Sequence, residues 1–376
     1  MLVATLAALL TAPACSGASD ARPTLPHSTT RPAVVGAPTV GKPVRAKVGR
    51  WKGHHPVRLA IAWERCDPSS GHCKRIKARW KRTYVPSLAD VGLSLAVRVT
   101  ARNHAGRVTR TSRRSRPVTP GRGSRVLFLD TFNGRDGLVT NEYAFFNPSD
   151  TEATHSLRWE MTSGSLFRQG GTGWTGRPTR GEPDRRSTSE NDSAIFRLRT
   201  RRADFGDVAV RFRLRNDGLR EDADTPAVAW DGVHVFLRYQ SQYHLYYASV
   251  NRRDNTAVIK KKCVGGPSNG GTYYTLGESV AHPVPYGRWQ DVVATVENDA
   301  SGGVSIALTA GGQHVVSTRD DGIGCDPIRS PGAVGIRGDN AEFHIEDFEV
   351  ETLRAERPAR PAATPDRGPY RRPARS

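Results

Sequence analysis

The sequence has few methionines, an odd number of cysteines and no long apolar run among its 376 residues. No stretch reaches the ~20 apolar residues that a membrane-spanning helix needs, so we expect a mature chain that does not cross a bilayer. Cysteine and histidine are not spaced as in zinc sites, and no fingerprint for an organic cofactor stands before a helix. We therefore expect no organic cofactor, and the 37 glycines and 25 prolines predict short strands joined by turns.

Acidic residues are scarce in the first third of the chain. Residues 1–120 hold 22 lysines and arginines against 4 acidic residues, whereas residues 121–353 hold 27 against 31. Residues 354–376 are again basic, with 7 against 2. A polyanionic partner should therefore meet residues 16–120, and we expect an anionic cell-wall polymer there rather than nucleic acid.

The N-terminus is typical of an exported protein. The apolar run Leu2–Leu10 is followed by the small residues Ala12-Pro13-Ala14, so residues 1–15 form a predicted leader. Cys15 stands where a bacterial lipoprotein carries its lipid, although an ordinary secretory signal explains the same pattern. We expect an extracellular protein, freely secreted or held at the membrane through that lipid alone. Residues 16–32 are a predicted linker, and the Pro/Arg-rich residues 354–376 a disordered tail.

Residues 33–118 alternate as strands do and contain a set of spaced tryptophans, glycines and cysteines. They resemble the immunoglobulin-like modules repeated in bacterial secreted proteins, whose pattern runs G-x-W, W-x-x-C-D, G-x-x-C, Y, D-x-G and V-T-A-x-N. The glycine and cysteine of the third motif are one residue closer together in this chain. The matching residues are Gly49–Trp51, Trp63–Asp67, Gly71–Cys73, Tyr84, Asp90–Gly92 and Val99–Asn103. The resemblance implies a β-sandwich that acts as a spacer or adhesive unit.

Residues 119–124 form the boundary to a second β-rich domain over residues 126–353. Ten or more strand-like runs separated by turn signals, without a helical period, predict a sandwich of two sheets. This domain resembles the laminin-G and concanavalin-like jelly rolls of glycan-binding modules, glycosidases and polysaccharide lyases. The fold class is thus all-β. The segments that carry the likeness are Leu127–Phe132, Gly164–Leu166, Gly287–Val292, Gly303–Ile306 and Phe343–Val350.

Four cysteines divide between the two domains. Cys66 and Cys73 fall in the first, and Cys263 and Cys325 in the second, so we predict one disulfide in each. Cys15 is left over.

The stretch 232–262 carries the candidate site. If the chain turns at Gln240–Gln242, period-two alternation buries the apolar face that includes Val233, Val235, Leu237, Tyr239, Tyr243, Leu245 and Tyr247. The opposite face then carries His234, Phe236, Arg238, Gln240, His244 and Tyr246, with Lys260 and Lys262, or Lys261, added by the next strand. Aromatic rings can stack on sugars, and cations beside them can bind sugar hydroxyls or carboxylates. The pattern therefore predicts a polysaccharide site. An ordinary solvated sheet face is the alternative.

Three functions fit this pattern. The first is glycan binding without catalysis. The second is a lyase on an acidic polysaccharide, in which Arg238 or Lys260 neutralises the carboxylate and His244 or Tyr246 removes the proton. The third is an adhesive or structural wall protein. The paired carboxylates of jelly-roll glucanases are missing, which disfavours a retaining glycosidase.

Two aspartates are candidate calcium ligands. Asp130 opens the second domain and Asp347 closes it, and in similar sandwiches the two end strands lie together and hold a structural Ca²⁺. The alternative is that both cap strand ends.

Overall fold

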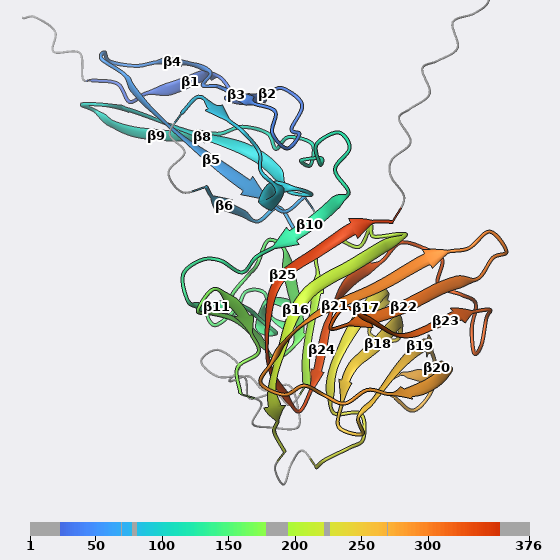
Figure 1. The fold of residues 1–376 in the computed structure, drawn as a ribbon. Helices are drawn as coiled ribbons and strands as arrows, with labels where there is room; N and C mark the ends of the chain where they lie inside the picture. The colour runs from blue at the N-terminus through green and yellow to red at the C-terminus, as the bar shows by residue number, and fades with distance from the viewer. Residues whose placement is uncertain are drawn as a thin grey trace, which may run out of the picture.

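The computed structural model describes residues 23–68, 70–76, 81–177, 195–221, 226–268 and 270–353. The predicted leader, Cys15 and the predicted tail lie outside these residues. Nearly all of the regular structure is β-strand, as predicted, and it forms an N-terminal unit and a larger C-terminal sandwich (Figure 1). No helix in the described part of the chain is long and apolar enough to span a membrane.

The N-terminal unit is built from three small sheets. Their orders are β1-β4, β2-β3-β7 and β6-β5-β8-β9. The strands are β1 His27–Thr30, β2 Ala33–Val35, β3 Val44–Lys47, β4 Arg50–Lys52, β5 Arg58–Cys66, β6 Cys73–Arg75, β7 Thr83–Tyr84, β8 Ser94–Asn103 and β9 Gly106–Thr111, with a 3₁₀ turn at Leu88–Asp90.

A tryptophan and a carboxylate organise the core of this unit. Trp63 is fully buried, contacts the Tyr84 ring at 5.6 Å between centroids, and donates its indole N–H to the carbonyl oxygen of Lys81. The buried carboxylate of Asp90 accepts a 2.6 Å hydrogen bond from the hydroxyl of Tyr84 and pairs with Arg65 at 2.9 Å. Strands whose paired residues are 28 to 44 positions apart in sequence are thereby tied to one core.

The predicted linker over residues 16–32 is wrong in part. His27–Thr30 forms strand β1, which pairs antiparallel with β4, and the side chain of Asn103 donates hydrogen bonds to the carbonyl oxygens of Thr24 and His54. Ser28 to Thr30 have the hydroxyl and β-branched side chains that an edge strand tolerates. The folded unit therefore starts well before residue 33.

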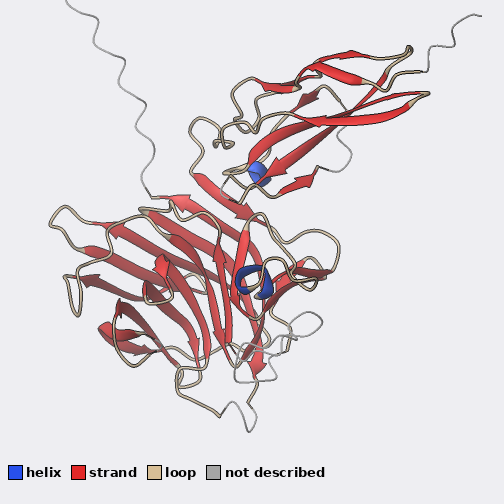
Figure 2. Cartoon of the chain, turned by 180° about the vertical axis from the view of Figure 1, so that it is seen from behind, coloured by secondary structure: helices blue, strands red, loops and turns tan. Residues whose placement is uncertain are grey.

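The C-terminal unit is a two-sheet sandwich, as predicted for residues 126–353 (Figure 2). In its described residues, one sheet runs β11-β13-β14-β25-β16-β21-β22-β23, with β10 also paired to β25, and the other runs β12-β15-β24-β17-β18-β19-β20. The elements are β10 Val126–Asp130, β11 Gly137–Asn141, α1 Tyr143–Phe146, β12 Trp159–Ser163, β13 Ser165–Gln169, β14 Thr172–Trp174, β15 Ile195–Thr200, β16 Val208–Leu219, β17 Gly232–Ser241, β18 His244–Arg252, β19 Thr256–Val264, β20 Gly271–Ala281, β21 Trp289–Asn298, β22 Val304–Ala310, β23 Gln313–Asp320, β24 Ala333–Asp339 and β25 Ala341–Thr352.

The core lies between these two sheets. Alternate residues of each strand point into it, among them Val235 and Leu237 from the seven-stranded sheet and Phe212 and Phe348 from the other. Burial of apolar area on this scale is the main favourable term in folding, at roughly 25 cal/mol per Å². One face of the seven-stranded sheet is thereby fixed against the core, and its other face forms the candidate site.

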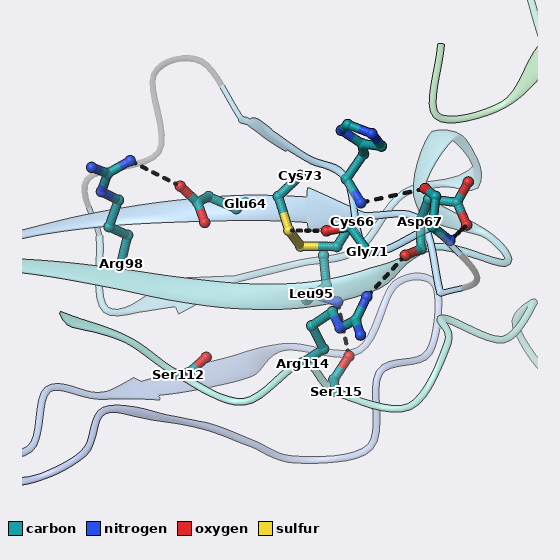
Figure 3. Close-up of a disulfide and its surroundings, with 12 residues drawn as sticks. Glu64, Cys66, Asp67, Gly71, Cys73, Leu95, Arg98, Ser112, Arg114 and Ser115 are labelled. Atoms are coloured by element: carbon teal, nitrogen blue, oxygen red, sulfur yellow. Dashed lines mark hydrogen bonds and ion pairs between the residues drawn. A yellow bond between two sulfur atoms is a disulfide. The ribbon is translucent and has the colours of Figure 1, made fainter. Parts of the chain in front are cut away.

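Both predicted disulfides are confirmed. Cys66 bonds to Cys73 across the β5–β6 hairpin, as Figure 3 shows, and Cys263 of β19 bonds to Cys325 in the segment after β23. The second bond joins a strand of the seven-stranded sheet to the segment between β23 and β24, 62 positions apart in sequence.

Candidate functional site

A cleft lies on the face of the seven-stranded sheet that turns away from the core. It has a volume of about 360 Å³ and crosses β15, β24, β17, β18, β19 and β20. Four of its lining side chains are cationic and five are aromatic. The described lining residues are Ile195, Arg197, Trp230, Phe236, Tyr239, Gln242, Leu245, Tyr247, Lys260, Lys262, Pro267, Ser268, Tyr273 and Arg337.

The three adjacent lysines of β19, residues 260–262, point to alternate faces of the sheet. Lys260 and Lys262 line the cleft, which is one of the two alternatives that the sequence left open, whereas Lys261 points to the opposite side. Its ammonium group is fully buried, 2.8 Å from the Asp320 carboxylate, and donates to the carbonyl oxygen of Cys325. Because successive side chains of a strand point to opposite faces, three adjacent lysines serve two separate environments.

The predicted face of the 232–247 hairpin is wrong for its second strand. The structure pairs Phe236 with Tyr247 and Leu237 with Tyr246, so even-numbered residues of β17 share a face with odd-numbered residues of β18. Leu245 and Tyr247 therefore line the cleft and Tyr246 lies in the core. The prediction paired residue 238 with 244, and a one-residue error in register exchanges the two faces of a strand.

Arg238 also departs from its predicted position. It has a φ of +48° within an irregularity of the pairing between β17 and its neighbours, and this break in alternation turns its side chain away from the cleft. The buried guanidinium donates to the carboxylate of Asp207 at 2.9 Å and to the carbonyl oxygens of Gly206 and Ile328. Tyr239, predicted to be core, is brought onto the cleft face beside Phe236 instead.

Tyr246 is as deeply buried as Arg238. Its hydroxyl donates to Asp320 at 2.5 Å and accepts the backbone N–H of Ile328 at 2.8 Å. Burial and the hydrogen bond to Asp320 raise the pKa of Tyr246 far above its ordinary value. The exposed positions predicted for Arg238 and Tyr246 are therefore wrong, and both side chains hold the sandwich together.

The remaining predicted residues fall in three places. Phe236 lines the cleft. His234 is on the same face but fully buried, 3.2 Å from Asp339 and edge-on to the Tyr247 ring at 4.8 Å. Gln240 and His244 lie outside the described cleft lining, in a separate hollow near Cys325. Of the predicted set, the structure brings together Phe236, Lys260 and Lys262, with His234 behind them.

A buried ion pair fixes one wall of the cleft. Arg337 donates to both carboxylate oxygens of Asp339, at 2.7 and 2.6 Å, and its remaining nitrogen donates to the hydroxyl of Tyr273 at 3.2 Å. Burial alone would raise the pKa of Asp339, but the charge of Arg337 and hydrogen bonds from His234 and Arg337 hold it well below its usual range. Burial lowers the pKa of His234 despite Asp339, so its ring is neutral near pH 7.

Two lysines are the least compensated charges of the cleft. Neither Lys260 nor Lys262 has a side-chain hydrogen bond or ion pair to a described residue, and no aspartate or glutamate is among the described lining residues. The ammonium group of Lys262 lies 4.8 Å from the centroid of the Tyr273 ring. Burial, with the charges of Arg337 and Arg197, lowers the pKa of Lys262 to about 8.

Arg197 completes the positive cluster. It donates to the side-chain oxygen of Gln242 at 2.8 Å, while its buried Nε has no hydrogen-bond partner among the described residues. Burial and the charge of Arg337 lower its pKa. Cations that are desolvated and lack acceptors gain most from an anionic ligand, so the cleft can bind carboxylate, sulfate or phosphate groups.

Of the two predicted calcium ligands, Asp130 has other partners, and Asp347 is an exposed residue with a φ of +48°. β10 and β25 do lie side by side, with Asp130 opposite Phe348. The Asp130 carboxylate accepts the indole N–H of Trp159 at 2.8 Å and the backbone N–H of Phe132 at 3.0 Å. No group of three or more histidine, cysteine, aspartate or glutamate residues that could hold a metal ion occurs in the described part of the chain. These donors fit a structural role, and calcium stays a prediction.

Sequence reasoning missed four residues that define the cleft. Arg197 and Arg337 come from strands 140 positions apart that pair directly with each other. The alternating pattern predicts Tyr247 in the core, whereas the structure places it in the cleft. Tyr273 stands in a run of aromatic residues, and the pattern does not predict which face of the sheet it occupies. A signal for Arg337 was present in its neighbour at i+2, Asp339, because two residues on the same strand face can form an ion pair.

Comparison with known proteins identifies no family. No protein-family model matches the chain, and no curated protein matches it. Solved structures with a similar arrangement include LamAcat from Zobellia galactanivorans, with 14% identity, a TM-score of 0.38 and coverage of 61% of this chain and 98% of that one.

Two further structures match at the same level. Alginate lyase Aly36B has 8% identity and a TM-score of 0.36, and the match covers 63% of this chain and 99% of that one. A Bacillus subtilis protein of unknown function with a galectin-like fold has 12% identity and a TM-score of 0.36, covering 52% and 89%. Likeness at this level does not determine an activity, so the function must follow from the side chains of the cleft.

Proposed function

We propose that the protein binds an acidic polysaccharide in the cleft of the seven-stranded sheet. The observation that carries this proposal is the convergence of Arg197, Arg337, Lys260 and Lys262 on one cleft whose described lining residues include no carboxylate. Uronate carboxylates pair with such cations through charge-assisted hydrogen bonds. A neutral glucan would leave the desolvated ammonium of Lys262 without a counter-charge.

The aromatic lining supports a sugar ligand rather than a small inorganic anion. Tyr247 and Tyr273 lie 5.5 Å apart between ring centroids, and Tyr239, Phe236 and Trp230 extend the aromatic surface along the cleft. Such rings present flat apolar faces with polar edges, which suit the faces and hydroxyls of pyranose rings. Most of the described lining residues come from six adjacent strands, a width that suits a polymer lying across the sheet.

The positive charge is specific to the cleft. Residues 121–353 contain 31 acidic residues against 27 basic ones, so a cluster of four cations is not a consequence of overall composition. The domain's negative balance by itself counts against a lyase, because uronate polymers favour basic clefts. The local charge of the folded cleft removes that objection.

Disulfides in both units support a protein that acts outside the cell, where an oxidising environment keeps them formed. In this proposal the N-terminal unit is an immunoglobulin-like spacer, and the C-terminal sandwich is a concanavalin-like jelly roll that carries the sugar site.

A second candidate function is cleavage of the same polymer by β-elimination. A base removes the proton beside the uronate carboxyl, the carbon–oxygen bond to the leaving sugar breaks, a carbon–carbon double bond forms, and the leaving oxygen takes up a proton. Lys262, with its pKa of about 8, has about a tenth of its amine unprotonated at pH 7 and is the candidate base. Tyr273, hydrogen-bonded to Arg337, is the candidate donor to the leaving oxygen, and Arg197 the group that neutralises the carboxylate.

Titration calorimetry with polygalacturonate, alginate and a neutral β-glucan tests the proposal. We expect binding to the two uronate polymers, about tenfold or greater weakening in Lys262→Met, and no change in Arg288→Met, an exposed cation outside the cleft. Equal binding of the neutral glucan, or equal losses in both variants, would contradict it. The ultraviolet absorbance of an unsaturated uronate, followed in the same samples, decides between binding alone and the lyase.

A further inference from the structure

The N-terminal unit carries a second cationic surface, on the outer face of the sheet β6-β5-β8-β9. The inner face of this sheet packs Trp63, Leu95, Val97 and Val99 into the core. The register of the strands arranges the outer face in rows that run across the sheet. Each row lies two residues from the next along a strand, or about 7 Å.

One row consists of arginine alone. Arg58 of β5 pairs with Arg102 of β8, and Arg102 pairs with Arg107 of β9. All three side chains are exposed, and none has a hydrogen bond or ion pair to an acceptor in the described residues. Like charges directly opposite each other on a sheet destabilise it. This row therefore carries an electrostatic cost that an external anion would relieve.

The next row is small and uncharged. Ala60, Thr100 and Thr109 lie side by side, and the two threonine hydroxyls are 3.0 Å apart. Together with Ala62 they floor a hollow of about 370 Å³, which the side chains of Arg98 and Arg107 also line. Short side chains between longer arginines make a trough that a polymer backbone can enter.

A single acidic residue borders this hollow among the described residues. Glu64 lies 3.7 Å from Arg98, as Figure 3 shows, and pairs across the strands with Arg75, so it belongs to the part of the sheet away from the arginine row. The arginine row keeps its full charge.

We infer that this outer face, which we call the arginine trough, binds a linear polymer bearing phosphate or sulfate groups. Three guanidinium groups on adjacent strands, ~5 Å apart at the backbone, place three positive charges within ~10 Å. Guanidinium forks donate paired hydrogen bonds to tetrahedral oxyanions, and closely spaced phosphates or sulfates match this charge density. The trough is on a different unit from the uronate cleft, so the protein would hold an anchoring polymer and a polysaccharide ligand at once.

The test uses the whole protein and two probes that contain no uronate, dextran sulfate as the sulfated polymer and poly(ribitol phosphate) as the phosphodiester polymer. The variant replaces Arg58, Arg102 and Arg107 together by threonine, which suits an exposed strand. We expect affinity for at least one probe to fall about tenfold or more, with a shallower dependence of the logarithm of affinity on the logarithm of salt concentration. The probe that responds more strongly identifies the chemistry.

The matched control replaces Arg45, Arg50 and Arg110 by threonine. These three are also exposed arginines of strands in the same unit, but they lie outside the trough, and the net charge changes equally. Unchanged binding in the control supports the trough. Equal losses in the two triple variants, or no loss in the first, would overturn it. Polygalacturonate binding in the cleft should survive in the Arg58/Arg102/Arg107 variant, so failure of the cleft proposal remains separate from failure of this one.

Discussion

Lys261 and Lys262 are adjacent on β19, and we predict opposite consequences when each is replaced by methionine. Lys261 is buried against the core with its ammonium group 2.8 Å from Asp320, and both side chains have no exposed surface. Lys261→Met removes the counter-charge and leaves Asp320 buried with the Tyr246 hydroxyl and the Gly322 backbone N–H as its remaining donors. Breaking a buried pair in this way costs about 3–5 kcal/mol.

The magnitude is large enough for calorimetry to resolve. For a domain of this size, 1 kcal/mol corresponds to about 2–4 °C, so the thermal midpoint of the C-terminal sandwich should fall by about 6–20 °C. The double variant Lys261→Met/Asp320→Asn should recover part of the loss, because the uncompensated charge is gone while an acceptor for Tyr246 remains.

Lys262→Met provides the matched comparison. Lys262 has no acceptor among the described residues and its pKa is already lowered by burial, so its removal should change stability by less than about 1 kcal/mol while weakening polyuronate binding. A loss below about 1 kcal/mol for Lys261→Met, or a loss as large for Lys262→Met, would refute the assignment of the two lysines to opposite faces.

Three further predictions concern the same domain. Arg238→Ala should destabilise the sandwich by about 3 kcal/mol, because several buried carbonyl oxygens lose their donor. Polyuronate affinity, measured well below the unfolding transition, should not change. Weakened binding in that folded variant would place Arg238 in the site. Polyuronate affinity should decline between pH 7 and pH 9, since the Lys262 cation is lost as the pH rises through its pKa of about 8. Lys262→Arg should make the affinity less dependent on pH. An identical decline in that variant would assign the titration to another group. Replacing Cys263 and Cys325 by serine opens a loop of 62 residues and should cost about 4 kcal/mol by loop entropy, measured as a shift in thermal midpoint; an unchanged midpoint would contradict the estimate.

The sequence alone determined the all-β class and the two disulfide pairs. Turn signals at short intervals and the absence of a helical period are local properties, and they define a two-sheet sandwich without knowledge of which strands pair. The cysteine pairs followed from compartment and from their division between domains. The lysine run 260–262 showed that charge would appear on the sheet, because alternation places at least one lysine on each face.

The tertiary structure decided which side chains meet. The face of β18 depends on its register with β17, and the irregular pairing at Arg238 is not visible in an alternating pattern. Arg197 and Arg337 reach the cleft because β15 and β24 pair across 140 residues, a contact that no local pattern encodes. Local propensity fixes the period of a strand, whereas register and neighbours are fixed by burying one face of every strand against a shared core. The composition of the site is therefore a property of strand pairing.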